Sequence, residues 1–216
     1  MNRILLLITL SIFYSCSGSS SNGNTQTPNS HSEIQNSHPG VGPIAIIGDS
    51  LAYGTGATDN TVKPAGCLAQ LQNLGVSSYA VPGTTSVQVA SSSSKALSIR
   101  PKLVFVSSGG NDTLIDYNQP GQYPEAKTLQ EMSDLFDVLA AEHNVVAYLG
   151  LNPPVPYSTR LPKISQLAES KGVIVVDGMS GLWSDASMMS DQIHPNNAGY
   201  SLMCNRILAA ITPYYP

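Results

Sequence analysis

The chain has 216 residues, enough for one domain of ordinary size with a tail. Hydrophobic residues make up 42% of it and charged residues only 11%, against roughly 25% in a typical soluble protein. Its 10 basic and 14 acidic residues give a net charge of -4, which excludes a large cationic surface, so no nucleic-acid partner is expected. Three cysteines are too few for a disulfide-built scaffold, and no apolar run reaches the ~18 residues of a membrane-spanning helix.

The first residues have the pattern of an export signal. Arg3 precedes the apolar segment 4–14, which has the length of a signal-peptide core and is too short to span a bilayer. The segment ends at Ser15-Cys16, which resembles the lipobox of bacterial lipoproteins, in which the cysteine is lipidated and becomes the new N-terminus. The alternative is an ordinary secretory signal in which Cys16 is incidental.

We therefore expect residues 1–15 to be a signal peptide and Cys16 to carry the only membrane anchor. Residues 16–42 are rich in Ser, Asn, Gly, Thr and Pro, with Glu33 as their one charge. Such a segment cannot bury enough apolar surface to fold, so it is expected to be a disordered tether. The expected protein is an exported lipoprotein, facing the periplasm or in the outer membrane, or otherwise periplasmic or secreted, with its domain at 43–216.

The domain alternates short apolar runs with helical patterns. The apolar runs are rich in β-branched residues or leucine and predict strands buried on both faces, at 44–47, 76–81, 103–107, 145–151 and 173–176. Helices are expected from Pro64 to 74, more weakly over the serine-rich 86–99, and on apolar stripes at 126–140 and 202–211. This alternation predicts a parallel sheet covered by helices on both faces, with a site beyond the carboxyl ends of the strands.

Polar motifs follow these strands or stand near the C-terminus. They are Gly48-Asp49-Ser50-Leu51, Pro82-Gly83-Thr84-Thr85, Gly109-Gly110-Asn111-Asp112 and Asp191-Gln192-Ile193-His194-Pro195. Among them are a serine, an aspartate and a histidine, which together make an activated nucleophile. Serine is weak until a base takes its proton, and a neutral imidazole, with an ordinary pKa of about 6.5, can do so at pH 7.

Elimination identifies the base. Three of the four histidines have a simpler explanation, in the tether or at the end of a predicted helix, namely His31, His38 and His143. His194 instead stands in a loop of the domain, three residues after Asp191, and a turn can bring these two positions onto one side. A helix cap is the alternative role for Asp191.

Taken together, these motifs resemble those of the SGNH (GDSL-type) hydrolases over about residues 44–200. The four blocks of that family would be carried here by Ser50, Gly83, Asn111 and His194, and their spacing is similar to that of the small thioesterase- and lysophospholipase-like branch. The resemblance implies a three-layer α/β/α, flavodoxin-like fold with a five-stranded parallel sheet of order 2-1-3-4-5.

The resemblance also implies a role for each residue. Ser50 would be the nucleophile, with His194 as base and Asp191 orienting it, and no metal or cofactor would be needed. The backbone amides of Ser50 and Gly83 and the side-chain amide of Asn111 would form an oxyanion hole. Gly83 and Asn111 could instead be turn formers. Two further acidic residues in the blocks are expected to orient the loops by side-chain-to-backbone bonds, namely Asp49 and Asp112.

Two cysteines remain in the domain. Cys67 lies in the first predicted helix and Cys204 in the last, and in a sheet of order 2-1-3-4-5 these helices are neighbours on one face. In an exported protein they could form a disulfide. The alternative is a pair of buried thiols that act as small hydrophobes.

The substrate is the least determined part of the prediction. The loops expected to wall the site are 53–63, 113–124, 152–160 and 178–190, and their aromatic and methionine side chains could line an acyl pocket or belong to the core: Tyr53, Tyr117, Tyr123, Tyr157, Trp183, Met188 and Met189. Short loops favour a shallow groove for small carboxylic esters or thioesters, including short acyl esters and lysophospholipids, in a monomeric enzyme. The alternatives are an O-acetylesterase acting on carbohydrate or cell-wall material and a non-catalytic, tethered binding module.

Overall fold

The computed structural model describes residues 42–71, 75–141, 144–153 and 160–215. The predicted signal peptide, Cys16 and nearly all of the predicted tether lie outside these ranges, as do His31, His38, His143 and Tyr157. Within them, no helix is both long enough and apolar enough to cross a membrane.

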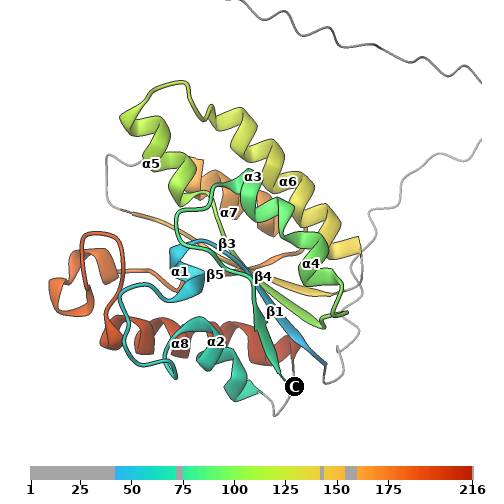
Figure 1. The fold of residues 1–216 in the computed structure, drawn as a ribbon, viewed down its shortest axis with the longest axis vertical. Helices are drawn as coiled ribbons and strands as arrows, with labels where there is room; N and C mark the ends of the chain where they lie inside the picture. The colour runs from blue at the N-terminus through green and yellow to red at the C-terminus, as the bar shows by residue number, and fades with distance from the viewer. Residues whose placement is uncertain (1–41, 72–74, 142–143, 154–159, 216) are drawn as a thin grey trace, which may run out of the picture. The chain divides into compact units, whose positions relative to one another are not determined.

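The centre of the fold is a five-stranded parallel sheet of order β2-β1-β3-β4-β5, which confirms the predicted fold class (Figure 1). Its strands are β1 Ile44–Gly48, β2 Val76–Ser78, β3 Leu103–Ser107, β4 Val145–Leu149 and β5 Ile174–Val176. Every residue of β1 and β3 is buried, as expected for strands covered on both faces. Gly48 pairs with Ser107, so β1 and β3 end side by side.

Helices cover both faces of this sheet. They are α1 Ser50–Tyr53, α2 Pro64–Leu68, α3 Ser86–Ser91, α4 Ser93–Leu97, α5 Gly110–Asn118, α6 Glu125–Ala141, α7 Arg160–Ser170 and α8 Asn197–Ile211. Short 3-10 turns η1 to η4 add Ala69–Leu71, Leu182–Ser184, Ala186–Met188 and Thr212–Tyr214. In Figure 1, α2 and α8 lie below the sheet, whereas α3, α4, α6 and α7 lie above it.

Some predicted strands are shorter in the structure than the sequence suggested. The second strand stops at Ser78 instead of Val81, although the N–H groups of Tyr79 and Val81 still bond to β1. β4 ends at Leu149, and β5 begins at Ile174. A run of β-branched residues marks extended backbone, which here continues past the last ladder pair, as the bonds of Tyr79 and Val81 to β1 show.

The predicted helix over 86–99 is broken into α3 and α4 at Ser92. The hydroxyls of Ser91 and Ser92 both donate to the carbonyl of Gln88. Serine hydroxyls compete in this way with the backbone N–H for helix carbonyls. The serine-rich centre of the segment therefore accounts for the break.

Two helices occupy segments that the sequence did not predict as helical. α5 covers part of the expected loop 113–124, and α7 follows the expected loop 152–160. The apolar spacing of Leu161, Ile164 and Ala168 fits one helix face, and all three are buried. Pro162 argues against a helix in the sequence, because proline disrupts helix interiors. It lies here in the first turn of α7, where proline is tolerated.

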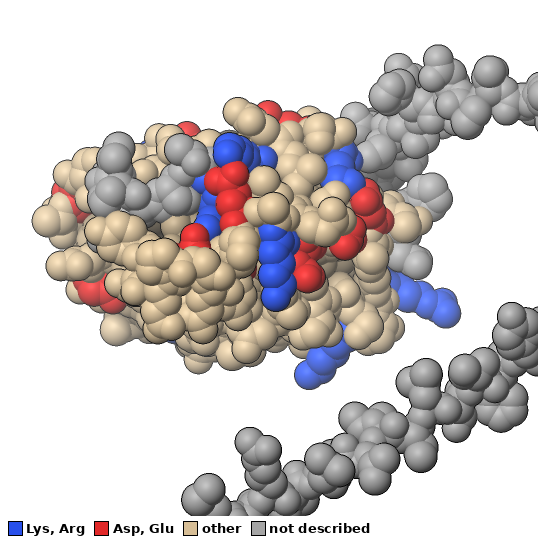
Figure 2. All heavy atoms as spheres, turned by 90° about the horizontal axis from the view of Figure 1, so that it is seen from above, with Lys and Arg blue, Asp and Glu red and all other residues tan. Residues whose placement is uncertain are grey.

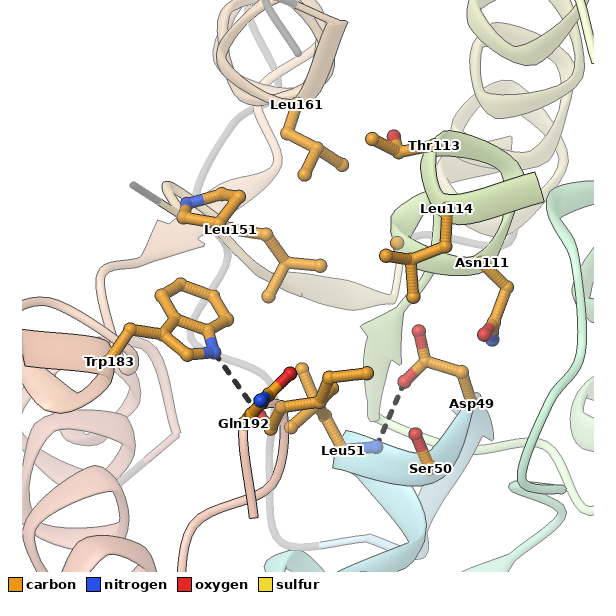
Figure 3. A pocket seen from close by; sticks show the side chains of 13 residues that line it. Asp49, Ser50, Leu51, Asn111, Thr113, Leu114, Leu151, Leu161, Trp183 and Gln192 are labelled. Atoms are coloured by element: carbon orange, nitrogen blue, oxygen red, sulfur yellow. Dashed lines mark hydrogen bonds between the residues drawn. The ribbon is translucent and has the colours of Figure 1, made fainter. Parts of the chain in front are cut away.

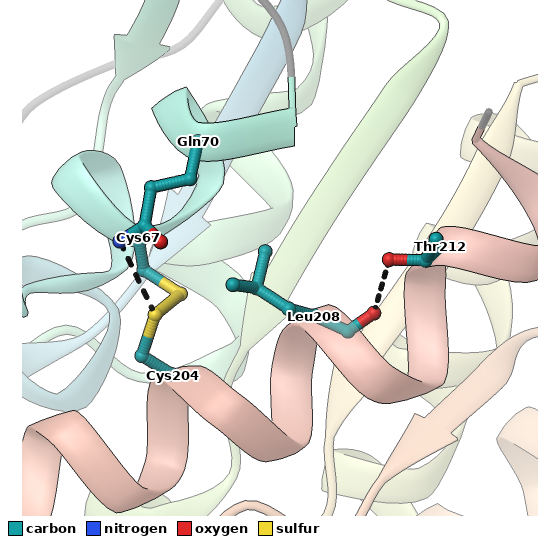
Figure 4. Close-up of a disulfide and its surroundings, with 5 residues drawn as sticks. All are labelled: Cys67, Gln70, Cys204, Leu208 and Thr212. Atoms are coloured by element: carbon teal, nitrogen blue, oxygen red, sulfur yellow. Dashed lines mark hydrogen bonds between the residues drawn. A yellow bond between two sulfur atoms is a disulfide. The ribbon is translucent and has the colours of Figure 1, made fainter.

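A disulfide joins the two helices below the sheet. Cys67 of α2 is bonded to Cys204 of α8, with their Cα atoms 5.5 Å apart (Figure 4). Gln70 lies beside the bond and donates to the Cys204 sulfur. Of the two alternatives left open by the sequence, the structure shows the disulfide.

The charged surface is sparse and mixed. Figure 2 shows one face on which most of the surface is uncharged and basic and acidic side chains lie close together. α6 and α7 are linked by two such pairs, Lys163 with Glu125 and Lys171 with Asp137. The face in view therefore lacks the extended cationic patch of a nucleic-acid-binding protein.

Candidate active site

Ser50 is placed by the sharp turn from β1 into α1. The Asp49 side chain caps α1 by accepting from the N–H of Leu51 at 3.0 Å, and it also accepts from the Ser107 hydroxyl at 2.8 Å. Asp49 is only 2% exposed. Burial raises its pKa, although the bonds from Ser107 and Leu51 act in the opposite direction. The side chain thus ties the ends of β1 and β3 to the helix that begins with the serine, as expected for an orienting residue.

Ser50, His194 and Asp191 form one chain of hydrogen bonds. Nε2 of His194 lies 2.9 Å from Oγ of Ser50, and Nδ1 of His194 lies 2.8 Å from Oδ2 of Asp191. The His194 side chain is 16% exposed and the Asp191 side chain 53% exposed. If Nδ1 carries the proton toward Asp191, Nε2 is free to accept the Ser50 proton. The structure therefore brings together the three residues predicted as catalytic.

The loop that carries Asp191 and His194 is closed by its own bonds. Oδ1 of Asp191 accepts from the N–H of Ile193 at 2.7 Å and of His194 at 2.8 Å, and the N–H of Ser190 bonds to the His194 carbonyl. Burial opposes ionisation of Asp191, but the bonds from His194 and Ile193 outweigh it, and its pKa lies below the ordinary value. Asp191 is therefore a carboxylate that both orients the imidazole and shapes the loop.

The side chains of Trp183 and Asn196 border the loop that carries Asp191 and His194. The indole N–H of Trp183 donates to the carbonyl of Ile193 at 3.2 Å. Asn196 caps α8 by accepting from the N–H groups of Ala198 and Gly199. The helix cap is thus Asn196, while Asp191 faces the histidine.

Gly83 and Asn111 lie on adjoining loops at the same edge of the sheet. Gly83 has a φ of +82°, a conformation that favours glycine, and the loop around it is bonded to Gly48 through Val81 and Thr84. The side-chain amide of Asn111 donates to the carbonyl of Thr84 at 2.8 Å. Within the described residues, the backbone N–H groups of Ser50 and Gly83 donate no hydrogen bond to the protein, so both can serve a ligand.

A pocket of about 170 Å³ opens beside Ser50 (Figure 3). Its walls are mostly apolar and come from β-strand ends, helices and the histidine loop: Leu51, Leu114, Leu151, Pro153, Leu161, Trp183 and Ile193. Polar side chains of Asp49, Ser50, Asn111, Thr113 and Gln192 also reach it. Ser50 therefore faces a space suited to an apolar group of a substrate.

Most of the side chains expected to line such a pocket lie elsewhere. Of the members of that predicted set that the structure describes, only Trp183 is on its wall. Tyr53 and Tyr117 are more than half exposed, and Met188 packs against the core. Met189 also packs against the core and borders a separate depression beside Asp191.

Known proteins resemble this chain in sequence and in fold. The sequence matches the family model of the GDSL-like lipase/acylhydrolase family over residues 46–202, most of the chain. The chain belongs to this family. It is accordingly an ester hydrolase of the SGNH type. A search of curated proteins found no match.

Solved structures of similar fold agree with the family. The fold resembles a psychrotrophic esterase, EstA from Pseudoalteromonas sp., with a TM-score of 0.66, 20% identity, and 81% of this chain and 98% of that one covered. It also resembles TesA, with a TM-score of 0.68, 23% identity, and 80% and 99% covered. An acetylxylan esterase from Geobacillus stearothermophilus gives a TM-score of 0.65 at 16% identity, with 80% and 94% covered.

The pocket walls of this GDSL-type hydrolase were mostly missed from the sequence. Leu51 and Ile193 stand inside the catalytic motifs, beside Ser50 and His194, and could have been chosen for that reason. Leu114 lies three residues after Asn111, on the same side of a helix, once α5 is known. Leu161 was hidden because α7 was not predicted.

A metal site is not apparent in the described part of the chain. There, no group of three or more His, Cys, Asp or Glu side chains is arranged to hold an ion. That the reaction needs no metal or cofactor stays a prediction, which addition of a chelator can test.

Proposed function

We propose that this hydrolase is a serine esterase that cleaves carboxylic esters and thioesters of short acyl groups through an acyl-enzyme on Ser50. The observation that best supports this proposal is the continuous series of hydrogen bonds from Asp191 through His194 to Ser50, at the mouth of an apolar pocket. Each member is already within hydrogen-bond distance of the next, as nucleophilic catalysis requires.

The reaction has two steps. In the first, Oγ of Ser50 attacks the acyl carbonyl while Nε2 of His194 takes its proton, and that proton then passes to the departing alcohol or thiol. In the second, His194 takes a proton from water, the resulting hydroxide attacks the acyl-enzyme, and Ser50 leaves with the proton as the carboxylic acid is released. Asp191 stabilises the imidazolium formed in both steps.

The negative charge that develops on the acyl oxygen needs donors already in place. We assign this role to the backbone N–H groups of Ser50 and Gly83 and to the side-chain amide of Asn111. Asn111 has two N–H bonds, of which one is used on Thr84, so the other can face the oxyanion. One such donor typically contributes about 10²–10³ in rate.

The pocket volume suggests the size of the acyl group. An apolar cavity of about 150 Å³ holds a benzene molecule, so a pocket of similar volume suits a chain of about six carbons or fewer. The longer chain of a lysophospholipid would have to extend beyond these walls. Short acyl esters are therefore the favoured substrates.

Labelling with a fluorophosphonate tests this function. The wild-type protein should take the label, and Ser50→Ala should not. p-Nitrophenyl esters with acyl chains of increasing length should then show highest kcat/KM for short chains. A protein that takes no label and cleaves none of these esters would instead be the tethered binding module.

A carbohydrate O-acetylesterase is the second candidate. The fold likeness to an acetylxylan esterase supports it, as does a polar surface poor in charge. Acetyl groups occupy little of the apolar pocket, so the alcohol side would have to provide the specificity. A kcat/KM for acetylated xylo-oligosaccharides far above that for p-nitrophenyl butyrate would favour this candidate.

We also propose that the enzyme is an exported, monomeric lipoprotein. The signal-like N-terminus with Cys16 supports export, and so does the Cys67–Cys204 disulfide, since such bonds persist in oxidising compartments. In a bacterial host, metabolic labelling with a fatty acid should mark the wild-type protein and not Cys16→Ser. Light scattering of the purified domain would test the monomer.

A further inference from the structure

Arg160 begins α7 and is almost completely buried, at 4% exposure. Its guanidinium donates to the Asp116 carboxylate at 2.6 Å, to the Tyr123 carbonyl at 2.8 Å and to the Thr128 hydroxyl at 3.1 Å. These bonds connect α7 to α5, to the loop after α5, and to α6. The hydrogen bonds of this buried charge therefore hold the Arg160 end of α7 against these neighbours.

Thr128 links Arg160 to a second buried acidic residue. Its hydroxyl accepts from Arg160 and donates to Oδ1 of Asp112 at 3.3 Å. Asp112 is fully buried and also accepts from the N–H of Ser86 at 2.8 Å and from its hydroxyl at 2.5 Å. A continuous chain of polar groups therefore runs from Asp116 through Arg160, Thr128 and Asp112 to Ser86.

One end of this polar chain supports the proposed oxyanion hole. Asp112 is the residue after Asn111, and Ser86 begins α3 three residues after Gly83. By binding both N–H and hydroxyl of Ser86, Asp112 holds the Gly83 loop against the start of α5. The bond from Asn111 to Thr84 joins the same two segments.

The other end supports the acyl pocket. Leu161 follows Arg160 and is a pocket wall, across from Thr113 in Figure 3. Leu161 and Ile164 also pack on the backbone of Gly109, where a Cβ would come within 2.6 Å of Ile164. Because Gly109 is two residues before Asn111, a shift of α7 would be felt at both the pocket and the oxyanion donors.

We propose that Thr128 is a positioning residue whose hydroxyl keeps the α7 wall of the pocket in register with the Gly83 and Asn111 loops. This role rests on the proposed esterase function. A hydroxyl suits the position because it accepts from the Arg160 cation and donates to the Asp112 carboxylate at the same time. Thr128 contacts no substrate, since it does not line the pocket.

The test replaces the hydroxyl without changing the shape. Thr128→Val is nearly isosteric and lacks the hydroxyl, whereas Thr128→Ser keeps it. We expect Thr128→Val to lower kcat about tenfold, with less change in KM, because small displacements of positioned groups are costly. Its preference between short and longer acyl chains should also flatten. Thr128→Ser should retain the wild-type kcat and preference.

Controls separate positioning from stability. Thr212→Val makes the same change at the end of α8, where the hydroxyl donates to the Leu208 carbonyl one turn earlier, and should leave kcat and chain-length preference unchanged. Thermal melting is measured for every variant. A Thr128→Val protein with lowered Tm but wild-type kcat and preference would overturn the proposal, since its role would then be structural.

Two other outcomes are also decisive. If Thr128→Val does not fold, Asp116→Asn can be used instead, because it weakens the series of polar groups at its more exposed end. An unchanged acyl-chain-length preference in Asp116→Asn would overturn the proposal. If the wild-type protein has no esterase activity, the proposed function fails and this role fails with it. An active wild type beside an equally active Thr128→Val refutes the positioning role alone.

Discussion

Asn197 and Thr58 lie 139 residues apart in the sequence and are joined by two hydrogen bonds. Oδ1 of Asn197 accepts from the N–H of Thr58 at 2.8 Å, and its Nδ2 donates to the Thr58 hydroxyl at 2.9 Å. Oδ1 also accepts from the N–H of Asp59. The loop after Ser50 and α1 is thereby fastened to the start of α8, three residues after His194. Gly56 of this loop packs so closely on Pro195 that no Cβ would fit there.

Asn197→Ala should therefore lower activity more than it lowers stability. Loss of the three bonds frees the 54–61 loop, and the 2.9 Å contact between Ser50 and His194 becomes less well populated. We expect kcat to fall by about tenfold, with Tm reduced by only a few degrees, because Asn197 is exposed to solvent. Asn144→Ala, which removes an amide that donates to the Leu139 carbonyl away from the site, is the matched control. Equal kcat in both variants would contradict the expectation.

Asp191→Asn should lower kcat far more than a change outside the series of hydrogen bonds that joins Ser50, His194 and Asp191. An amide in place of the carboxylate no longer stabilises the imidazolium and can favour the wrong tautomer of His194. The corresponding change in a serine protease lowers kcat by about 10⁴, and the half-exposed position of Asp191 argues for a loss of about 10²–10⁴ here. Single-turnover kinetics would show the loss in acylation. A kcat within threefold or so of wild type would mean that water replaces Asp191 as the partner of His194.

Activity should fall in acid, because a protonated imidazole cannot accept the Ser50 proton. Asp191 should lose its charge only below the ordinary pKa of an aspartate. Burial opposes its ionisation, but bonds from His194 and Ile193 hold its pKa below the ordinary value of 3.8. The measurement is kcat/KM on a p-nitrophenyl ester from pH 4 to 9, and a rate that stays level down to pH 4 would exclude a histidine base.

Acid unfolding should not interfere with that profile. Hydrogen bonds also lower the pKa of three other carboxyl groups, those of Asp59, Asp116 and Asp185. A carboxyl whose folded-state pKa is lowered stabilises the fold above its ordinary pKa, and this stabilisation is lost as the pH falls through the lowered value. The protein should thus remain folded at pH 5, where activity is already low. Circular dichroism at each pH checks this.

The acyl pocket can be narrowed or widened by single changes. A Cβ at Gly110 would project beside Leu151, at 3.4 Å from its Cδ1, in an ordinary helical conformation. Gly110→Ala should therefore shift the optimum toward shorter acyl chains, whereas Leu114→Ala, which removes part of a wall, should shift it toward longer ones. The ratio of kcat/KM for hexanoate and acetate esters measures both. Shifts in the same direction would mean that the acyl group binds elsewhere.

Local sequence patterns were sufficient to predict the buried strands and the bonded triad, and the resemblance to the SGNH hydrolases supplied the order of the strands in the sheet. Apolar β-branched runs mark the buried strands, and Ser50, Asp191 and His194 stand in short motifs with recognisable chemistry. The polar chain through Thr128 could not be predicted in this way. Thr128 lies in the first turn of α6, and only the packing of α6 against α3 and α7 brings it between Asp112 and Arg160.

The walls of the pocket likewise could not be predicted from local sequence patterns. Its walls come from leucines on separate elements, and nothing in the local sequence distinguishes Leu114 or Leu151 from ordinary core residues. Aromatic side chains in loops were the natural choice, yet Tyr53 and Tyr117 point largely into solvent. Pocket walls depend on which faces of α5 and α7 meet, and that is decided by tertiary packing.

The Cys67–Cys204 disulfide should contribute much of the thermal stability. It links residues 137 apart, and closing so long a loop restricts the unfolded chain, which typically stabilises a protein by about 2–5 kcal/mol. For a chain of this size, we expect reductant to lower Tm by roughly 5–15 °C. Calorimetry with and without reductant measures this difference. The double variant Cys67→Ser, Cys204→Ser should melt near the reduced wild type and show no response to reductant. If thiol titration confirms reduction but the wild-type Tm stays the same, the bond constrains the unfolded chain too little to matter, and the packing of α2 on α8 alone holds this face of the sheet.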